Sequence, residues 1–176
     1  MLFRSLNGAA IMWIIAAPLR LSAVNNSMSI IRAHGTCVAI DGEAVLLRGK
    51  PGSGKSDLAL RLIDGGALLV ADDQTELSRG ADVILAQAPA AIAGRIEVRG
   101  VGILPCPSVA SAPLRLVVDL VAGGEVERLP EAQSCRYLDI PLPLLRLAAF
   151  EASAPAKIRF ALRARGAAAR RPEPIA

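Results

Sequence analysis

The chain has 176 residues, of which 53% are hydrophobic and only 3% aromatic, and its net charge is +4. A chain of this length and apolar content can bury one core without disulfides and is too hydrophobic to be disordered throughout. The scarcity of aromatic side chains argues against nucleic-acid binding by base stacking, and the small net charge is typical of a solvated surface. We therefore expect a single domain that does not bind nucleic acid.

The N-terminal segment contains a short apolar run, residues 9–17 (AAIMWIIAA), that ends before Pro18. This run resembles the apolar part of a signal peptide, but it is too short to cross a bilayer as a helix. We expect residues 1–27 to be a disordered tail or the product of a mis-assigned start, with a cleaved signal peptide as the alternative. No membrane association is expected.

The three cysteines, Cys37, Cys106 and Cys135, have no metal-ligand spacing, and His34 is the only histidine. A histidine-rich metal site is therefore excluded. An odd number of unclustered cysteines is typical of small buried apolar residues in a reducing cytosol, so the expected location is cytoplasmic.

Strand-like patterns begin at Ile30. Two apolar runs, residues 37–40 and 44–47, flank Asp41-Gly42 and predict a hairpin with a tight turn. Residues 55–63 have the apolar spacing of a short helix that ends at Gly65-Gly66. The continuous apolar run 67–70 then predicts a buried strand.

Shorter segments follow at residues 83–85, 91–92, 95–98 and 114–121. Pro141 and Pro143 are expected to break the chain before a last helix over about 155–168. Neither an internal repeat nor a linker divides the chain. We therefore expect one α/β domain over residues 28–170.

The sequence GKPGSGKS follows the second strand of the hairpin and opens the predicted helix. It fits the phosphate-binding pattern G-x-x-x-x-G-K-[ST] in the strand-to-helix context that this pattern requires. Backbone N–H groups and the helix N-terminus would hold phosphate oxygens, the lysine would reach the β- and γ-phosphates, and the serine hydroxyl would face Mg²⁺. The predicted nucleotide-binding residues are Gly49, Lys50, Pro51, Gly52, Ser53, Gly54, Lys55 and Ser56.

Two apolar runs end in aspartate, the first at Asp72-Asp73 and the second at Asp119. An ordinary P-loop ATPase would use the later aspartate. The Asp72-Asp73 pair follows the phosphate loop by one helix and one strand, which would return it to the phosphates. Two adjacent carboxylates can divide the work, with one near a metal ion and one near a proton, although an aspartate pair can also be a solvated loop.

Three pieces in this order, Ala33-His34-Gly35, GKPGSGKS with LVADD, and EVRGVGI over residues 97–103, resemble the catalytic domain of bacterial HPr kinase/phosphorylase. The resemblance covers residues 30–145. It implies a P-loop α/β fold of the HPr kinase type, related to the nucleotide site of phosphoenolpyruvate carboxykinase. It also implies ATP-dependent phosphorylation of a serine on HPr, the phosphocarrier protein of the sugar phosphotransferase system, and so a role in regulating carbohydrate metabolism.

The resemblance also implies roles for single residues. Lys55 would act on the β- and γ-phosphates, and Ser56 and Glu97 would hold Mg²⁺. Asp73 would be the catalytic base with His34 beside it, and Asp72 is an alternative base because spacing does not separate the neighbours. Gly100 and Gly102 suggest a mobile loop over the substrate.

The resemblance has two departures. Only about 30 residues precede the kinase region, which is typical of a short form without a separate N-terminal domain. An Arg-Pro-Gly-Arg-Asn-like loop of the family is replaced after Ile140-Pro141, where only Arg146 is a possible remnant. That loop serves dephosphorylation and subunit contacts, so the resemblance supports the kinase reaction but neither the phosphorylase reaction nor the family's hexamer. The alternatives are a small-molecule kinase or ATPase and a non-catalytic nucleotide sensor.

Overall fold

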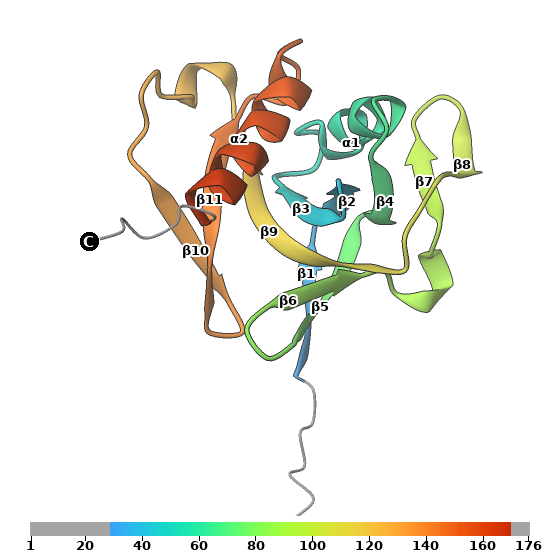
Figure 1. Ribbon diagram of the computed structural model, residues 1–176. Coiled ribbons are helices and arrows are strands. Elements are labelled where there is room, and N and C mark those ends of the chain that lie inside the picture. Colours follow the sequence, from blue (N-terminus) through green and yellow to red (C-terminus); the bar gives the residue numbers. More distant parts are fainter. Residues whose placement is uncertain (1–28, 170–176) are drawn as a thin grey trace, which may run out of the picture.

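A sheet of nine strands forms the centre of the computed structural model, which describes residues 29–169 (Figure 1). The strands follow the order β1–β5–β6–β9–β3–β2–β4, while β11 pairs with β9 and β10 with β11. The elements in chain order are β1 (Ile30–His34), β2 (Thr36–Ile40), β3 (Glu43–Arg48), α1 (Lys55–Asp64), β4 (Leu68–Ala71), β5 (Gln74–Arg79), β6 (Ile84–Gln87), a 3₁₀ turn (Ala90–Ile92), β7 (Arg95–Val98), β8 (Gly102–Pro105), β9 (Ser111–Leu120), a second 3₁₀ turn (Gly123–Glu125), β10 (Gln133–Tyr137), β11 (Ile140–Leu147) and α2 (Ala154–Ala169).

The predicted hairpin and first helix are both present. β2 and β3 pair antiparallel around Asp41-Gly42, and both turn residues have positive φ, 51° and 82°. Such a turn suits the twist of two adjacent strands, and Asp and Gly tolerate this backbone region. α1 ends at Gly65 and Gly66, whose N–H groups bond to Arg61 and Ile63 carbonyls at the helix end.

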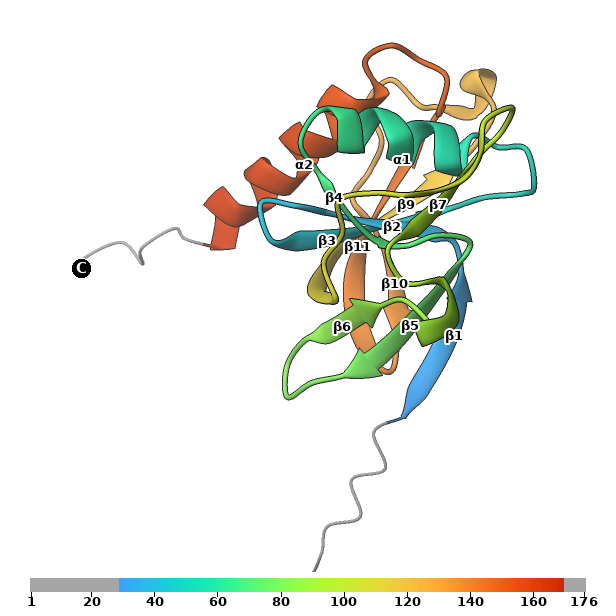
Figure 2. The ribbon, with the colours of Figure 1, turned by 90° about the vertical axis from the view of Figure 1, so that its right-hand side faces the viewer.

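Both helices cover one face of the sheet (Figure 2), and α1, α2 and that face share one core. β1, β5 and β6 join the sheet through β9 and fold over its opposite face, where they form a second core. The pairing of β3 with β9 shifts register between Ala44 and Val45, which changes the side of the sheet on which the following β9 side chains lie. Leu114 therefore belongs to the second core, while Leu116 belongs to the first. β9 therefore joins the two halves of the molecule.

β3, β9 and β11 are parallel to one another, so their carboxyl ends lie at the same edge of the sheet. The phosphate-loop sequence follows β3 directly. Loops at the carboxyl ends of parallel strands are the usual ligand sites of α/β sheets. This edge is therefore where the site is expected.

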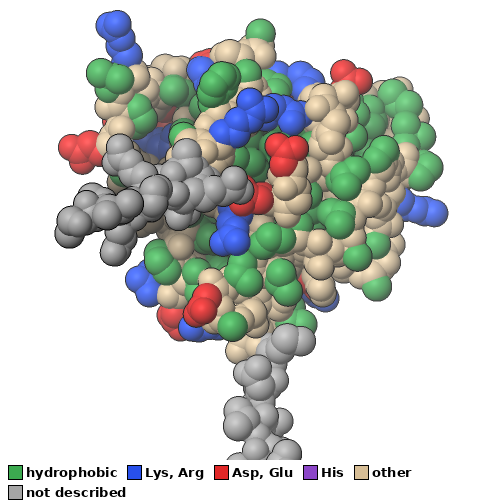
Figure 3. All heavy atoms as spheres, viewed as in Figure 1, with side chains coloured by type: hydrophobic (Ala, Val, Ile, Leu, Met, Phe, Trp, Pro, Cys, Tyr) green, Lys and Arg blue, Asp and Glu red, His purple; other side chains and the backbone are tan. Residues whose placement is uncertain are grey.

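β7 and β8 form a separate two-stranded hairpin beside α1. Its outer surface is apolar: Val101 and Ile103 are each 67% exposed and Leu104 is 40% exposed. Figure 3 shows hydrophobic side chains on the side of the molecule where Figure 1 draws this hairpin. Gly100 and Gly102 both have positive φ, so the predicted loop is a tight hairpin turn.

Several expectations are corrected. Pro141 and Pro143 do not break the chain but lie within β11, ahead of Leu144, where pairing with β9 begins. Their missing N–H groups therefore interrupt no bond to β9. β5, β8 and β10 are not predicted from the sequence, because they are short or polar strands.

The expectation that the cysteines are buried is correct for Cys37 but wrong for Cys106 and Cys135, which are partly exposed. All three are free thiols. The apolar run 9–17 and the predicted tail 1–27 lie outside the described residues. Within residues 29–169, no helix is both long and apolar enough to cross a membrane.

Candidate functional site

The phosphate loop connects β3 to α1 and depends on glycine backbone conformations. Gly52 and Gly54 have φ values of 80° and 92°, in the left-handed region that other residues rarely adopt. Gly54 also has no room for a side chain, because a Cβ atom there would lie 2.7 Å from Ala149 Cβ. The loop therefore needs glycine at this position for both conformation and space.

Lys55 is buried against the loop that precedes it. Its Nζ donates hydrogen bonds to the carbonyl oxygens of Gly49 at 3.0 Å and Lys50 at 3.2 Å. The ammonium group thus lies inside the loop curve, where it would meet phosphate oxygens. Ser53 Oγ, in the same loop, is buried without a hydrogen-bond partner among the described residues.

Asp72 is 8% exposed and lies behind the loop, at the end of β4. Its Oδ1 accepts hydrogen bonds from Thr36 Oγ1 at 3.0 Å and Ser56 Oγ at 3.4 Å. Its Oδ2 accepts one from the backbone N–H of Glu97 at 2.9 Å. One buried carboxylate therefore links β2, the start of α1 and the β7–β8 hairpin.

Asp73 faces the opposite way, with 68% of its side chain exposed and a φ of 60°. Its Oδ1 lies 3.5 Å from His34 Nδ1. Backbone contacts align the two segments: the Gly35 N–H donates to the Asp73 carbonyl at 2.8 Å. Gly35 has no room for a side chain on its β3 side, because a Cβ atom there would lie 2.6 Å from the Leu47 carbonyl oxygen.

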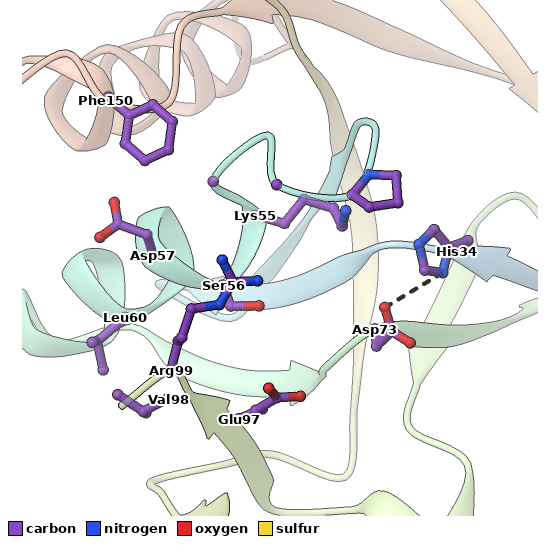
Figure 4. Close-up of a pocket in the computed structure, with 13 residues that line it drawn as sticks. His34, Lys55, Ser56, Asp57, Leu60, Asp73, Glu97, Val98, Arg99 and Phe150 are labelled. Atoms are coloured by element: carbon purple, nitrogen blue, oxygen red, sulfur yellow. Dashed lines mark ion pairs between the residues drawn. The ribbon is translucent and has the colours of Figure 1, made fainter. Parts of the chain in front are cut away.

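A pocket of about 510 Å³, here called the aspartate pocket, lies between the phosphate loop and this pair. Figure 4 shows His34 and Asp73 on one side, Lys55 and Ser56 in the middle, and Glu97 beside them. Residues from β1, the loop after β4, α1 and β7 are thus brought together. The predicted site residues that line this pocket are His34, Pro51, Gly52, Gly54, Lys55, Ser56, Asp73 and Glu97. Asp72 is not part of this lining.

A second pocket, of about 830 Å³, lies on the other side of the phosphate loop and is here called the β9–β11 pocket. Its wall includes the predicted loop residues Gly49, Lys50 and Ser53 together with the segments that follow β9 and β11. Phe150 lines both pockets. Sequence reasoning missed Phe150; the available signal was that the whole chain has only three Phe, one Tyr and one Trp.

Asp119 is the next-to-last residue of β9, beside the phosphate loop, where an ordinary P-loop ATPase would place its acid. Here its two oxygens accept hydrogen bonds from the Arg48 guanidinium at 2.7 and 2.9 Å. The Tyr137 hydroxyl accepts a third bond from Arg48 at 3.0 Å. Partial burial lowers the pKa of Arg48, but the bonds to Asp119 and Tyr137 outweigh burial and raise it, so the guanidinium stays charged. Asp119 is thus held in an ion pair with Arg48 and lines the β9–β11 pocket, whereas Ser56 lines the aspartate pocket.

The residues near Ser56 suit Mg²⁺, although residues 29–169 contain no group of three or more His, Cys, Asp and Glu side chains able to hold a metal alone. Mg²⁺ is commonly bound by one or two carboxylates together with substrate phosphates and waters. The Ser56 hydroxyl beside the Asp72 carboxylate, with Glu97 in the same pocket wall, matches that donor set.

A glycine-rich loop between a parallel strand and a helix, with paired aspartates beside it, defines a P-loop α/β domain. Comparison with known proteins gives the family. The sequence model of the HPr serine kinase C-terminal domain matches residues 26–151, and the chain belongs to this family.

Individual relatives agree with this assignment. The HPr kinase/phosphorylase of Cupriavidus metallidurans is 36% identical over 140 residues, and that of Alkaliphilus metalliredigens is 44% identical over 99 residues. These matches cover 73% and 54% of this chain but only 43% and 32% of the relatives. The chain thus spans less than half the length of these curated relatives. The solved HPr(Ser) kinase/phosphatase of Coxiella burnetii superposes with a TM-score of 0.70 at 25% identity, over 78% of this chain and 97% of that one.

Proposed function

We propose that this protein is an ATP-dependent protein-serine kinase that phosphorylates an HPr-type phosphocarrier in the cytoplasm and thereby regulates carbohydrate metabolism. The observation that carries the proposal is the exposed Asp73–His34 pair, which faces Lys55 across the aspartate pocket. Phosphoryl transfer requires positioning, charge neutralisation and one base, and the pocket offers a group for each. The names of the relatives support HPr as the substrate.

In this proposal Lys55 neutralises charge on the β- and γ-phosphates, while Ser56 and Glu97 hold Mg²⁺ with the Asp72 carboxylate beside them. Mg²⁺ would neutralise the phosphate charge that develops during transfer. Asp73 is favoured as the base over Asp72, because its carboxylate is exposed and Asp72 is enclosed by three hydrogen bonds. His34 orients the Asp73 carboxylate.

In the proposed reaction a phosphoryl group moves from ATP to the substrate serine. The substrate serine oxygen forms a bond to the γ-phosphorus, the bond from that phosphorus to the β–γ bridging oxygen breaks, and ADP leaves. The serine proton passes to the Asp73 carboxylate. A protein serine could approach because this face of the pocket is open, with 56% of the His34 side chain exposed.

The test is transfer of labelled phosphate from Mg-ATP to purified HPr of the same organism. Replacing Asp73→Asn should reduce the transfer rate by at least about a hundredfold, because the base is lost, while ATP binding remains. Asp139→Asn is the matched control, because Asp139 is also an exposed aspartate in the left-handed region, with a φ of 65°.

HPr with its target serine changed to alanine should take up no label. Label on wild-type HPr that persists with Asp73→Asn would contradict the role of Asp73. ATP binding without transfer to HPr would contradict the kinase proposal and favour a nucleotide sensor. ATP hydrolysis stimulated by a metabolite instead of HPr would favour a small-molecule kinase. The reverse reaction, which the relatives' names include, is then tested with inorganic phosphate and phosphorylated HPr.

A further inference from the structure

The β9–β11 pocket lies at the carboxyl ends of three parallel strands. The residues that follow β3 form the phosphate loop, those that follow β9 are Val121 and Ala122, and those that follow β11 are Ala148 and Ala149. Ligands of α/β sheets bind at such carboxyl ends. The pocket therefore continues the phosphate site on the side away from Asp73.

The lining of this pocket suits an uncharged ligand part better than a second phosphate. Leu120, Val121, Ala148 and Ala149 supply apolar surface. The carboxylates in the wall already have cationic partners: Asp119 pairs with Arg48, Glu125 with Arg146 at 3.3 Å, and Glu151 with Lys157. A neutral, partly apolar group would leave these ion pairs intact, whereas a free anion would meet the carboxylates.

Phe150 lies at the junction of the two pockets. Its ring edge touches the phosphate loop, since a Cβ atom at Gly54 would lie 3.0 Å from Phe150 Cζ. Figure 4 shows the ring standing over the start of α1, on the far side of the loop from His34. The residue is 71% exposed, which leaves its ring available for stacking. Stacking on an aromatic ring is a common way to hold a nucleobase.

We propose that the β9–β11 pocket takes the nucleoside part of the donor nucleotide, with the base against Phe150. The phosphates then cross the loop from this pocket into the aspartate pocket. The inference rests on the proposed function, because it assumes that the donor is a nucleoside triphosphate. It assigns the two pockets to different parts of the reaction, with nucleoside on one side of the loop and serine acceptor on the other.

The test compares two ligands by calorimetry, Mg-ATP and inorganic tripolyphosphate with Mg²⁺, which has the phosphates but no nucleoside. Phe150→Ala should weaken ATP binding about tenfold and leave tripolyphosphate binding unchanged. Phe160→Ala is the matched control: Phe160 is 70% exposed on α2 and outside the lining of both pockets. It should change neither affinity.

A second variant fills the pocket instead of removing the ring. Ala122 is exposed in the pocket wall, so Ala122→Trp should weaken ATP binding and spare tripolyphosphate. Ala81→Trp, on an exposed bend between β5 and β6, is its control. Tripolyphosphate binding also reports that each variant is folded.

The outcomes separate the two proposals. Equal ATP affinity in wild type, Phe150→Ala and Ala122→Trp would overturn the nucleoside assignment and leave the phosphate site standing. Equal loss of both ligands in Phe150→Ala would also overturn it, because the ring would then act on the loop. A wild-type protein that binds neither ligand would overturn the proposed function and this inference together.

Discussion

Asp72 and Asp73 are neighbours in the sequence, yet their carboxylates have opposite surroundings. Successive side chains at a strand end point to opposite sides, so one enters the interior and the other faces solvent. Asp72 is 8% exposed and Asp73 has 68% of its side chain exposed. Two identical groups can therefore serve different functions in one site.

The pKa of the Cys106 thiol depends in part on the charge of Asp72. Partial burial, and to a smaller degree the Asp72 carboxylate, raise the pKa of the Cys106 thiol. Because the thiolate is the reactive form, a raised pKa slows alkylation below that pKa. Asp72→Asn removes the negative charge and lowers the Cys106 pKa, so its alkylation by iodoacetamide should become faster at pH 7.5 and its pH profile should move to lower pH.

The measurement is mass spectrometry of labelled peptides over time. Cys135 is the internal control, because its pKa is raised mainly by its own burial and Asp72 is not among the causes. Cys37, fully buried, should stay unlabelled in the folded protein. An unchanged Cys106 rate in Asp72→Asn would contradict the electrostatic link.

The phosphate loop is an element whose shape depends on backbone freedom. Gly54 is the N-cap of α1 with a φ of 92° and accepts the first helical hydrogen bond from Leu58 N–H at 2.9 Å. The same conformation packs Gly54 against Ala149 and Phe150, from the segment after β11. The loop is therefore held by α1 on one side and by a distant strand connection on the other.

Comparing Gly54→Ala with Gly42→Ala separates these effects. Both glycines have positive φ, so alanine should cost about 1 kcal/mol of folding free energy at either site. A Cβ atom at Gly42 would meet nothing within 4 Å, whereas a Cβ atom at Gly54 would lie 2.7 Å from Ala149 Cβ. Gly54→Ala should therefore be the more destabilising change, by about 1–3 kcal/mol, and should also weaken tripolyphosphate binding.

Urea unfolding gives the two free energies, and calorimetry gives the affinities. Gly42→Ala should bind tripolyphosphate as the wild type does, since the hairpin turn is outside both pocket linings. Equal destabilisation by the two substitutions would show that crowding against Ala149 adds nothing to the loss of unfolding free energy at Gly54.

At the scale of the molecule, two cores lie on opposite faces of one sheet and share the strand β9. Leu114 is 1% exposed in the core against β1, β5 and β6, and Leu116 is 0% exposed in the core under the helices. Because β9, like β2 and β3, contributes residues to both cores, we expect the two cores to unfold together.

Leu114→Ala and Leu116→Ala test this coupling. Each should lower the free energy of unfolding by about 2–5 kcal/mol, through lost burial and the cavity that remains. Leu129→Ala, at a residue 89% exposed, should change it by less than about 0.5 kcal/mol. Circular dichroism and hydrogen exchange should report one transition in each variant. Two separate transitions would contradict a single cooperative unit.

Much of the site could be predicted from local sequence. The phosphate loop, the hairpin before it and the helix after it are short-range features, because glycine conformations and apolar spacing act over a few residues. The order of the Asp72-Asp73 pair after one helix and one strand also predicted its return to the loop. The prolines of β11 were misinterpreted, since only strand pairing reveals that they lie where no bond to β9 is needed.

The sequence by itself determined that this chain has a phosphate loop, paired aspartates and a resemblance to one kinase family, because these are patterns of adjacent residues. Only the tertiary structure decided which aspartate is exposed, that Asp119 is paired with Arg48, and that Phe150 stands between two pockets. Those facts depend on contacts between residues far apart in the chain. Such contacts are selected by the burial of both sheet faces, which no local pattern encodes.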